Sequence, residues 1–325
     1  MTIKGLSLPI VEPEVFDNSM LSTFQRCPRK GFYQYGLQRS PSGTNYPIQF
    51  GVGYHKFRET LESLYTKMKQ KGELACDPKL QRAIYELSFK AALAVTRVKD
   101  EDGKPYLGWK EPPIEHKHAF LSEHRLDKTC QEAFKIWLDE KQDGNIVIIL
   151  SEQSFDLDLP NGERYGGRFD QLIEWNHKLW LRDFKTTSRM GKGYGAKFDP
   201  DNQMPGYIWA SQRLSDETVE GVLIEVVYNT KTMGPDFFPF LSTRTEWQID
   251  DWERDAAYEI EIVRKHFLDM HFPKRTTACN DFGGCYFRDA CKSDGWPNIE
   301  RWLLQNTIHS VWDFANPDKE EGVVD

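Results

Sequence analysis

The sequence contains the stretch Tyr165-Gly-Gly-Arg-Phe-Asp-Gln-Leu-Ile-Glu-Trp-Asn-His-Lys-Leu-Trp-Leu-Arg-Asp-Phe-Lys-Thr-Thr187, which predicts two β-strands joined by a tight turn. Runs rich in Phe, Ile, Leu and Trp flank Asn176-His177, a polar pair suited to a turn. A loop of those two residues sets the pairing of the strands, whereas a longer loop would shift the register by a residue or two. With the shorter loop, the expected opposed pairs are Trp175–Lys178, Ile173–Trp180, Leu172–Leu181, Asp170–Asp183 and Phe169–Phe184.

The expected opposition of Asp170 and Asp183 is the most informative of these pairs. Directly opposed side chains have Cβ atoms roughly 4.5–5.5 Å apart, so two carboxylates there repel unless a cation lies between them. Lys185 shares a face with Asp183, because side chains two apart on a strand point the same way. Both faces are otherwise largely apolar, as in a central strand, and a buried Asp-Asp-Lys cluster is costly unless it has a function. The alternative is that the carboxylates lie on a half-exposed hairpin.

Bulk properties limit the class of protein. The chain has 325 residues, 39% of them hydrophobic and 13% aromatic, which is enough for a sizeable core. The formal net charge of −8 argues against broad coating of nucleic acid, but it allows a local basic groove around a metal site. No apolar run reaches the roughly 18 residues of a membrane span, and residues 1–10 lack the features of a signal peptide. We therefore expect a cytoplasmic protein with no membrane partner and with reduced cysteines.

Upstream of the hairpin, residues 48–53 lead into a predicted helix near Tyr54. Its apolar residues recur at helical spacing: Tyr54, Phe57, Leu61, Leu64, Tyr65 and Met68. His55 lies at the edge of this stripe and can reach a neighbouring cleft, although a histidine at a helix start can equally be structural. Imidazole is an unusual ligand for Mg²⁺ but is acceptable to Mn²⁺.

The segment between this helix and the hairpin predicts further elements. Residues 72–140 are expected to form a helical insertion, with helices at 80–98 and 119–140 and a loop at 99–113. Residues 146–159 predict strand structure closed by a turn at 160–163. Glu152 lies in that strand, either near the acidic site in a secondary role or as an exposed strand residue.

Downstream, residues 188–195 form a basic, glycine-rich loop in which Arg189 and Lys192 could contact phosphates. The alternative is a flexible surface loop. A helix over 199–214, starting near Asp201, would place Gln203 and Tyr207 on one face, because they are four residues apart. Further predicted elements are strands at 222–228 and 237–247 and an amphipathic helix at 250–270.

Three of the six cysteines, Cys279, Cys285 and Cys291, lie within thirteen residues near a Gly-Gly pair that frees the backbone. A helix with Ser19 as its N-cap is expected to carry Cys27, followed by Pro28. Taken alone, Cys27 is best interpreted as a buried small hydrophobic residue.

Six motifs resemble those of one known family when they are taken together. They are Ser19-x-Leu21-x-x-Phe24-x-x-Cys27-Pro28, Gly53-Tyr-His55, Gly167-Arg-Phe-Asp170, Asp183-Phe-Lys185-Thr186, Gln203-x-x-x-Tyr207 and the trio Cys279, Cys285 and Cys291. In this order they resemble the PD-(D/E)XK nuclease superfamily, and within it the RecB-like and Cas4-like exonuclease branch.

The resemblance implies an α/β (α+β) fold with a restriction-endonuclease-like core, in which helices flank a mixed central β-sheet. It implies a single nuclease domain over 1–325, with a sheet core at 146–248, a C-terminal helix and cysteine cluster at 250–312, and a disordered acidic tail at 313–325. The four thiolates of Cys27, Cys279, Cys285 and Cys291 would staple the chain ends through a [4Fe-4S] cluster. Zinc is the alternative, since four thiolates also suit Zn²⁺. The chain departs from the branch, which often has two residues between its first two clustered cysteines, whereas this chain has five.

The resemblance also implies a function, namely metal-dependent hydrolysis of DNA, most often as an exonuclease. Asp170, Asp183, His55 and the Phe184 carbonyl would hold Mg²⁺ or Mn²⁺. Lys185 would act on the attacking water, and Gln203 and Tyr207 would position the strand. The partners would be DNA, single-stranded or with free ends, and a separate helicase or recombination protein. The alternatives are a non-catalytic DNA-binding scaffold and a site- or structure-specific endonuclease.

Overall fold

The computed structural model describes residues 2–41, 46–70, 77–96, 117–215, 217–230 and 234–315. These residues fall into two compact units. We call residues 44–153 and 169–244 the sheet unit, and residues 1–43, 154–168 and 245–325 the terminal unit. Strand β4 (Arg164–Trp175) begins in the terminal unit and ends in the sheet unit. That the whole chain acts as one nuclease domain stays a prediction.

The remaining strands and helices of the described residues have the following bounds. The strands are β1 (Val15–Phe16), β2 (Arg39–Pro41), β3 (Ile146–Asp158), β5 (Lys178–Thr187), β6 (Val219–Tyr228), β7 (Asp236–Ser242) and β8 (Thr307–His309). The α-helices are α1 (Asn18–Arg26), α2 (Pro28–Gly31), α3 (Tyr46–Gln70), α4 (Pro78–Val95), α5 (Lys117–Asp143), α6 (Gln203–Ser215), α7 (Glu246–Leu268), α8 (Arg288–Lys292) and α9 (Trp296–Asn306). Shorter helical segments are η1 (Phe32–Gly36), η3 (Tyr194–Phe198) and η4 (Thr276–Gly283).

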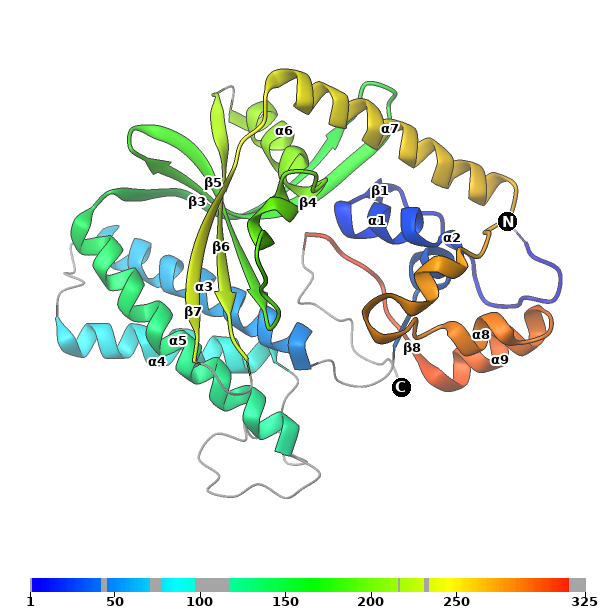
Figure 1. Cartoon of the computed structure of the whole chain (residues 1–325), viewed down its shortest axis with the longest axis horizontal. Helices are drawn as coiled ribbons and strands as arrows, with labels where there is room; N and C mark the ends of the chain where they lie inside the picture. The colour runs from blue at the N-terminus through cyan, green and yellow to red at the C-terminus, as the bar shows by residue number, and fades with distance from the viewer. Residues whose placement is uncertain are drawn as a thin grey trace. The chain divides into compact units, whose positions relative to one another are not determined.

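The main sheet has the strand order β1-β4-β5-β6-β7, and β3 also pairs with β4 (Figure 1). The pairs β1–β4 and β5–β6 are parallel, whereas β4–β5 and β6–β7 are antiparallel. The predicted mixed α/β fold, with a central sheet flanked by helices, is therefore confirmed. Strand β5 has neighbours on both sides, as its apolar sequence on both faces predicts.

The hairpin of β4 and β5 has the predicted two-residue loop. Asn176 and His177 both have left-handed backbones, with φ of 51° and 60°, as a type I′ turn requires. The ladder confirms three expected pairs, Trp175–Lys178, Ile173–Trp180 and Leu172–Leu181. Pairing ends at Gln171–Arg182, so Asp170 and Asp183 come directly after the last pair and the expected Phe169–Phe184 pair does not extend the ladder.

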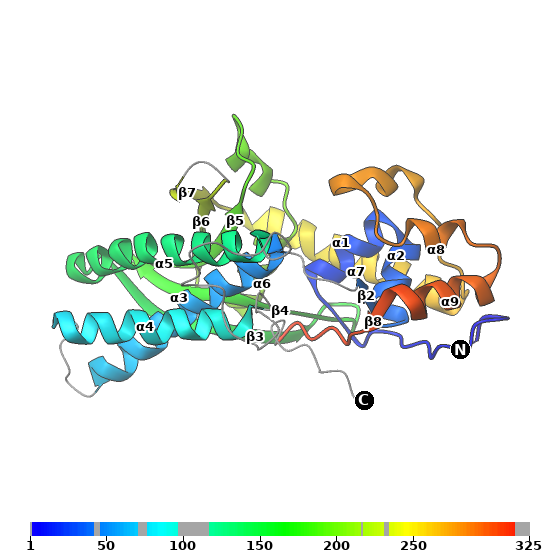
Figure 2. The same ribbon diagram turned by 90° about the horizontal axis from the view of Figure 1, so that it is seen from below.

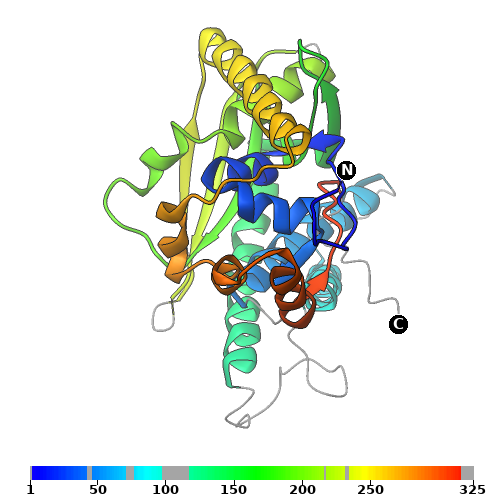
Figure 3. The same ribbon diagram turned by 90° about the vertical axis from the view of Figure 1, so that its right-hand side faces the viewer.

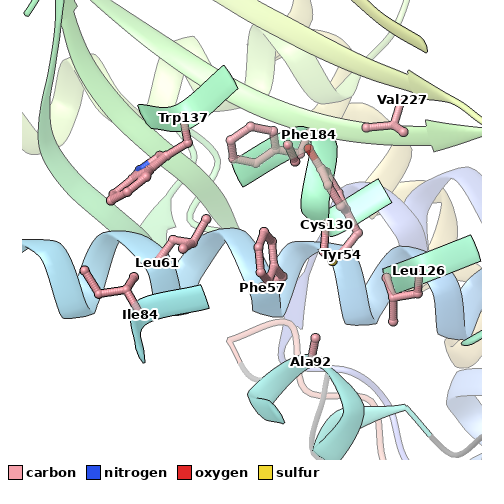
Figure 4. Close-up of a cluster of buried hydrophobic side chains, with 11 residues drawn as sticks. Tyr54, Phe57, Leu61, Ile84, Ala92, Leu126, Cys130, Trp137, Phe184 and Val227 are labelled. Atoms are coloured by element: carbon pink, nitrogen blue, oxygen red, sulfur yellow. The ribbon is translucent and has the colours of Figure 1, made fainter. Parts of the chain in front are cut away.

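Helices α3, α4 and α5 lie side by side and pack against the sheet through one apolar core (Figures 2 and 4). The core contains Tyr54, Phe57, Leu61, Ile84, Ala92, Leu126, Cys130, Ala133, Trp137, Phe184 and Val227. The predicted stripe along α3 is confirmed, since its first three members are fully buried and Leu64, Tyr65 and Met68 pack against them.

The start of α3 differs from the prediction, because the helix begins at Tyr46 and residues 48–53 are already helical. A Cβ at Gly53 would lie 2.7 Å from Thr96 Cγ2 and 2.8 Å from Leu126 Cδ2. The glycine therefore allows α3 to approach its neighbours closely, and it does not mark a loop. The loop predicted at 99–113 lies outside the described residues.

The start of α6, the end of β7 and the start of α7 differ from the predicted boundaries. Helix α6 starts at Gln203, and Pro205 lies in its first turn, where proline is tolerated. Strand β7 ends at Ser242, and α7 begins at Glu246 behind a capping box formed by Thr245 and Gln248. The prediction of strand structure up to residue 247 is therefore wrong for its last residues.

The terminal unit brings the two ends of the chain together (Figure 3). Helix α1 is capped by Asp17, which accepts the Met20 N–H at 2.7 Å, so Ser19 is not the cap. Strand β2 pairs antiparallel with β8, and the ring of Phe32 stacks at 4.0 Å on that of Phe272. In α7 the predicted apolar face is confirmed, with these residues buried: Trp252, Ala256, Ile260 and Val263.

Two further expectations concern the chain as a whole. Among the helices of the described ranges, none combines the length and the apolar character needed to cross a bilayer. Most of the tail predicted to be disordered, from residue 316 onward, lies outside the described residues.

Candidate active site

The sheet unit brings together the acidic, basic and imidazole side chains that the sequence singles out. Asp170 on β4 has Oδ1 at 3.2 Å from Nδ1 of His55 on α3. On β5, Lys185 Nζ lies 2.9 Å from Oδ1 and 2.8 Å from Oδ2 of Asp183. Asp170 and Asp183 are 8% and 2% exposed, whereas the side chains of His55 and Lys185 are about one third exposed. The four groups form one buried polar cluster that opens to solvent on its cationic side.

The second oxygen of Asp170 fixes this cluster to the backbone. Asp170 Oδ2 accepts the Phe184 N–H at 2.7 Å. That N–H lies just beyond the last ladder pair, where the strands no longer bond to each other. A carboxylate thus takes the place of a strand carbonyl, which ties the side chain of β4 to the Asp183-Phe184 peptide of β5.

The ring of Phe184 anchors this peptide from the other face of the sheet. The ring is 2% exposed and lies 6.2 Å from the Tyr54 ring in an edge-on contact. The guanidinium groups of Arg58 and Arg182 lie 4.6 Å and 5.2 Å from its centre. Because side chains alternate along a strand, burying Phe184 turns its neighbours Asp183 and Lys185 to the opposite face.

A buried charge network next to Phe184 was missed at the level of sequence. Arg182 has no exposed surface, and it donates to Glu140 of α5 at 2.6 Å and to Glu225 of β6 at 2.6 Å. The signal that could have revealed it is a pair of opposite charges interrupting two apolar strands, Arg182 in one and Glu225 in the other. The network immobilises the residue directly before Asp183.

The charges of the four site residues perturb one another. Burial raises the pKa of Asp170, but the nearby His55 outweighs it and holds the pKa below its usual value. For His55, burial acts to lower the pKa, yet Asp170 raises it to about 9. Burial and the charge of Asp170 together raise the pKa of Asp183 despite the contact with Lys185. The carboxylates of Asp170 and Asp183 therefore share the cations of His55 and Lys185, and the charge of Asp183 is not fully neutralised.

The donor set fits a divalent cation. Two carboxylates and the backbone oxygen of Phe184 are hard ligands, and one imidazole adds a nitrogen that Mn²⁺ accepts more readily than Mg²⁺. Asp183 Oδ2 is buried and receives no hydrogen bond, although Lys185 Nζ is close to it. Over the described ranges, however, no three or more His, Cys, Asp or Glu side chains are already gathered around a common point that could hold a metal.

Gln203 and Tyr207 lie on one face of α6, because Gln203 Nε2 donates to the Tyr207 hydroxyl at 2.7 Å. The Tyr207 ring lies 6.5 Å from the ring of Phe169, the residue that precedes Asp170. Asp201, just before α6, also contributes to raising the pKa of Lys185 after the larger effects of Asp183 and Asp170. The start of α6 therefore lies within electrostatic reach of the acidic cluster.

Three other predicted site residues lie on the loop after β5 and on β3. Arg189 and Lys192 are exposed on the loop after β5, and neither forms an ion pair with a carboxylate in the described part of the chain. Glu152 lies in β3 with φ of 55°, a left-handed value that is rare for a residue other than glycine. The functions predicted for these three residues stay predictions.

The four candidate cysteines all lie in the terminal unit as free thiols. Cys27 ends α1 and is buried, whereas Cys279, Cys285 and Cys291 are half-buried. The Cys285 N–H donates to the Cys279 carbonyl at 2.9 Å, so these two are close along the backbone. The side chains do not assemble into a metal-holding group among the residues that the structure describes, so the predicted cluster is not confirmed.

Comparison with known proteins adds one strong match. A family model described as the PD-(D/E)XK nuclease superfamily matches residues 18–292. No curated protein matches the chain in sequence. Among solved structures, a "putative exonuclease" from Eubacterium rectale is 11% identical, with 82% of this chain and 86% of that chain covered and a TM-score of 0.46. A protein named SSO0001 is 15% identical, with 46% and 68% covered and a TM-score of 0.25.

Proposed function

This chain belongs to the PD-(D/E)XK nuclease superfamily. From that premise we propose that it is a divalent-metal-dependent deoxyribonuclease that acts as an exonuclease. The observation that carries the proposal is the cluster of Asp170, Asp183, Lys185 and His55. A protein that only binds or scaffolds DNA has no need to bury two carboxylates beside each other, because their repulsion lowers stability.

The metal site is the first part of the proposal. Asp170, Asp183, His55 and the carbonyl of Phe184 would hold Mg²⁺ or Mn²⁺. When bound, such an ion supplies a more acidic water and stabilises the charge that develops on the phosphate. Asp170 is held for this by the Phe184 N–H at 2.7 Å, which leaves its Oδ1 free to exchange the His55 imidazole for a cation.

The remaining residues would act on the water and on the strand. Lys185, whose pKa is raised and which therefore stays an ammonium, would orient the attacking water and offset the developing negative charge. Gln203 and Tyr207, which are already bonded to each other at 2.7 Å, would position the strand beside the acids. Arg189 and Lys192 would contact the flanking phosphates, because their charges are not neutralised by carboxylates within the described ranges.

The experiment is hydrolysis of end-labelled linear DNA and of closed circular DNA, with Mg²⁺, Mn²⁺ or EDTA. We expect cutting that requires the metal and a free end, and we expect Lys185→Ala to slow it about 10²- to 10³-fold. Cutting by Lys185→Ala at the parental rate would exclude the assignment. Cutting of closed circles would favour the alternative of a site- or structure-specific endonuclease, and no cutting by the parent would favour a scaffold.

A second part of the proposal concerns Cys27, Cys279, Cys285 and Cys291. We propose that they bind a [4Fe-4S] cluster, or alternatively Zn²⁺, that joins the ends of the chain. The support is that the four thiols are free and lie in one compact unit that contains both chain ends. An absorption spectrum and metal analysis of anaerobically purified protein test it, with Cys130→Ala as the control. A colourless, metal-free protein would exclude both forms.

The cellular setting is the last part of the proposal. As an exonuclease, the protein would act in the cytoplasm on DNA ends supplied by a separate helicase or recombination protein. Co-purification of such a protein with the full-length chain, reversed by DNA-end competitors, would test this.

A further inference from the structure

Strand β6 lies between β5 and β7 in the sheet (Figure 1), and the pairing of the three strands aligns aromatic residues of β7 with the candidate site residues of β5. Asp183 pairs with Ile224 of β6, and Ile224 pairs with Phe240 of β7. Two residues further along β5, Lys185 pairs with Val226, and Val226 pairs with Phe238. Residues paired across neighbouring strands point to the same face, so the two phenylalanines lie on the face that carries Asp183 and Lys185.

The register also gives the separation of these groups. Neighbouring strands are about 4.7–4.9 Å apart, so β7 lies about 10 Å from β5 across the sheet. Stacked nucleotides rise about 3.4 Å each along one strand of DNA, and roughly three of them span that distance. Phe238 is therefore about three nucleotides from a phosphate held at Asp183, on a path around Ile224 and Val226, which are fully buried.

The loop between β5 and α6 folds over this part of β7. The rings of Tyr194 and Phe198 lie 6.1 Å and 6.0 Å from the ring of Phe240. A Cβ at Gly195 would overlap Phe240 Cδ1, so glycine is needed for this close packing. Arg244 donates to the Phe198 carbonyl at 2.7 Å, which fastens the loop to the end of β7.

The surface formed in this way is both aromatic and basic. Phe238 is 39% exposed, Tyr194 is half-buried, and Phe198 is buried against Tyr194. The ammonium of Lys197 lies 3.8 Å from the centre of the Tyr194 ring, and no carboxylate pairs with it in the described ranges. Lys197 lies over one face of the Tyr194 ring, so the exposed ring available for stacking is that of Phe238. Exposed aromatic rings together with unneutralised cations are the usual composition of sites that bind single-stranded nucleic acid.

We propose that Phe238 stacks on an unpaired base close to the bond that is cut, and that Tyr194 and Lys197 of the loop packed on Phe240 lie on the path of the same strand. The inference rests on the proposed nuclease function and adds that unpaired DNA is preferred over duplex. Stacking requires an exposed base face, which a paired base in a duplex does not offer. Lys197 would contact a phosphate of the same strand. Phe240 and Phe198 pack against the Tyr194 ring and would hold the loop in place.

The test measures binding in a Lys185→Ala background, so that DNA is not consumed. The probes are a single-stranded oligonucleotide with 2-aminopurine near one end and a blunt duplex of the same sequence. We expect Phe238→Ala to weaken single-strand binding about 5- to 100-fold and to abolish the quenching of 2-aminopurine that stacking causes. Duplex binding should change less than about twofold, because the duplex uses phosphate contacts.

Controls separate stacking from a general loss of structure. Phe238→Trp should retain the single-strand affinity and the quenching, since it keeps an aromatic face. Tyr258→Ala removes another exposed ring, 63% exposed on α7, and should have no effect. A melting temperature equal to that of the parent will establish that each variant is folded.

The outcomes are distinguishable from those of the proposed function. Equal binding of the single strand by Phe238→Ala and its parent, or equal losses for single strand and duplex, would overturn the stacking site. So would the absence of any quenching in the parent. None of these results bears on whether metal-dependent cutting is lost in Lys185→Ala, which tests the nuclease itself.

Discussion

The sheet unit holds its candidate carboxylate ligands on paired strands, whereas the terminal unit holds its cysteines on separate helices and loops. In the sheet unit, Lys185 pairs with Asp183, and Asp170 is bonded to the backbone N–H of the residue between them, Phe184. In the terminal unit, the four cysteines predicted to share a metal do not form a metal-holding group within the described residues. Strand register converts sequence spacing directly into spatial spacing. Thiols on separate segments, by contrast, have their positions set by loops, and here also by any metal that binds them.

The largest expected effect is on catalysis in the sheet unit. We expect Asp183→Asn to reduce DNA hydrolysis about 10³-fold or more, because it removes a charged metal ligand and leaves Lys185 without its partner. The measurement is the cutting rate of end-labelled DNA at saturating Mn²⁺.

Its matched control is Glu174→Gln, which neutralises another carboxylate of the same hairpin. The Glu174 side chain is 46% exposed and contacts His177 at the turn. We expect an unchanged rate for this variant. A similar loss in both would mean that hairpin charge, and not the acidic cluster, supports activity.

The next effect is on stability, and it tests the buried network behind the site. Arg182→Met leaves Glu140 and Glu225 without their shared cation, and we expect a loss of about 3–5 kcal/mol in the free energy of unfolding. Urea denaturation followed by circular dichroism measures it. Arg82→Met breaks the exposed pair with Glu86 and should leave the midpoint unchanged. A stable Arg182→Met protein would show that the network does not support β5.

The third effect concerns the terminal unit. If Cys279 and Cys285 share a metal, removing one already releases it, so the second substitution costs little. A double-mutant cycle of the Cys→Ser variants should then show a coupling free energy of about 1–3 kcal/mol. Additive effects in protein purified anaerobically would indicate that the thiols are structurally independent.

The fourth effect is a substitution at the close approach of α3 to its neighbours. Gly53→Ala adds a methyl group at 2.7 Å from Thr96 Cγ2 and should cost about 1–3 kcal/mol through overpacking. Gly144→Ala is not a suitable comparison, because Gly144 has φ of +67°. Gly191→Ala is suitable, since nothing lies within 4 Å of its added Cβ. Equal thermal stability of the two variants would contradict the role assigned to Gly53.

The smallest expected effect is a dependence on pH. Burial raises the pKa of Glu140, but Arg182 and Arg58 outweigh it and hold the pKa below the ordinary value of 4.5. The carboxylate therefore stabilises the fold above that value, and the contribution is lost as the pH falls through the lower folded-state pKa. Arg182→Met should lose less stability than the parent between pH 5 and pH 3, as measured by urea midpoints. Parallel midpoints would contradict the assignment.

Particular residues show why some predictions succeed. Asn176-His177 sits between strands with matched apolar alternation, so one turn length aligns the pairs from Trp175–Lys178 to Leu172–Leu181. The stripe of Tyr54, Phe57 and Leu61 likewise becomes the buried face of α3. Both patterns are local, because period 2 and period 3.6 follow from the geometry of a single strand or helix.

Other features depend on segments that are distant in sequence. The partners of Arg182 come from α5 and β6, 42 and 43 residues away, and no local pattern names them. The sequence predicted Ser19 as the N-cap of the first helix, and only the folded chain assigns the cap to Asp17. Phe238 faces the same way as Lys185 because β6 is inserted between β5 and β7 with a particular register.

The sequence alone therefore determined the hairpin, the proximity of Asp170 to Asp183 and Lys185, and the family to which they belong. The tertiary structure alone decided which strands lie beside that hairpin, which charges are buried behind it and where the four thiols are placed. The physical reason is the range of the interactions. Turn chemistry and side-chain alternation act over a few residues, whereas strand order, ion pairing and helix packing depend on the whole fold.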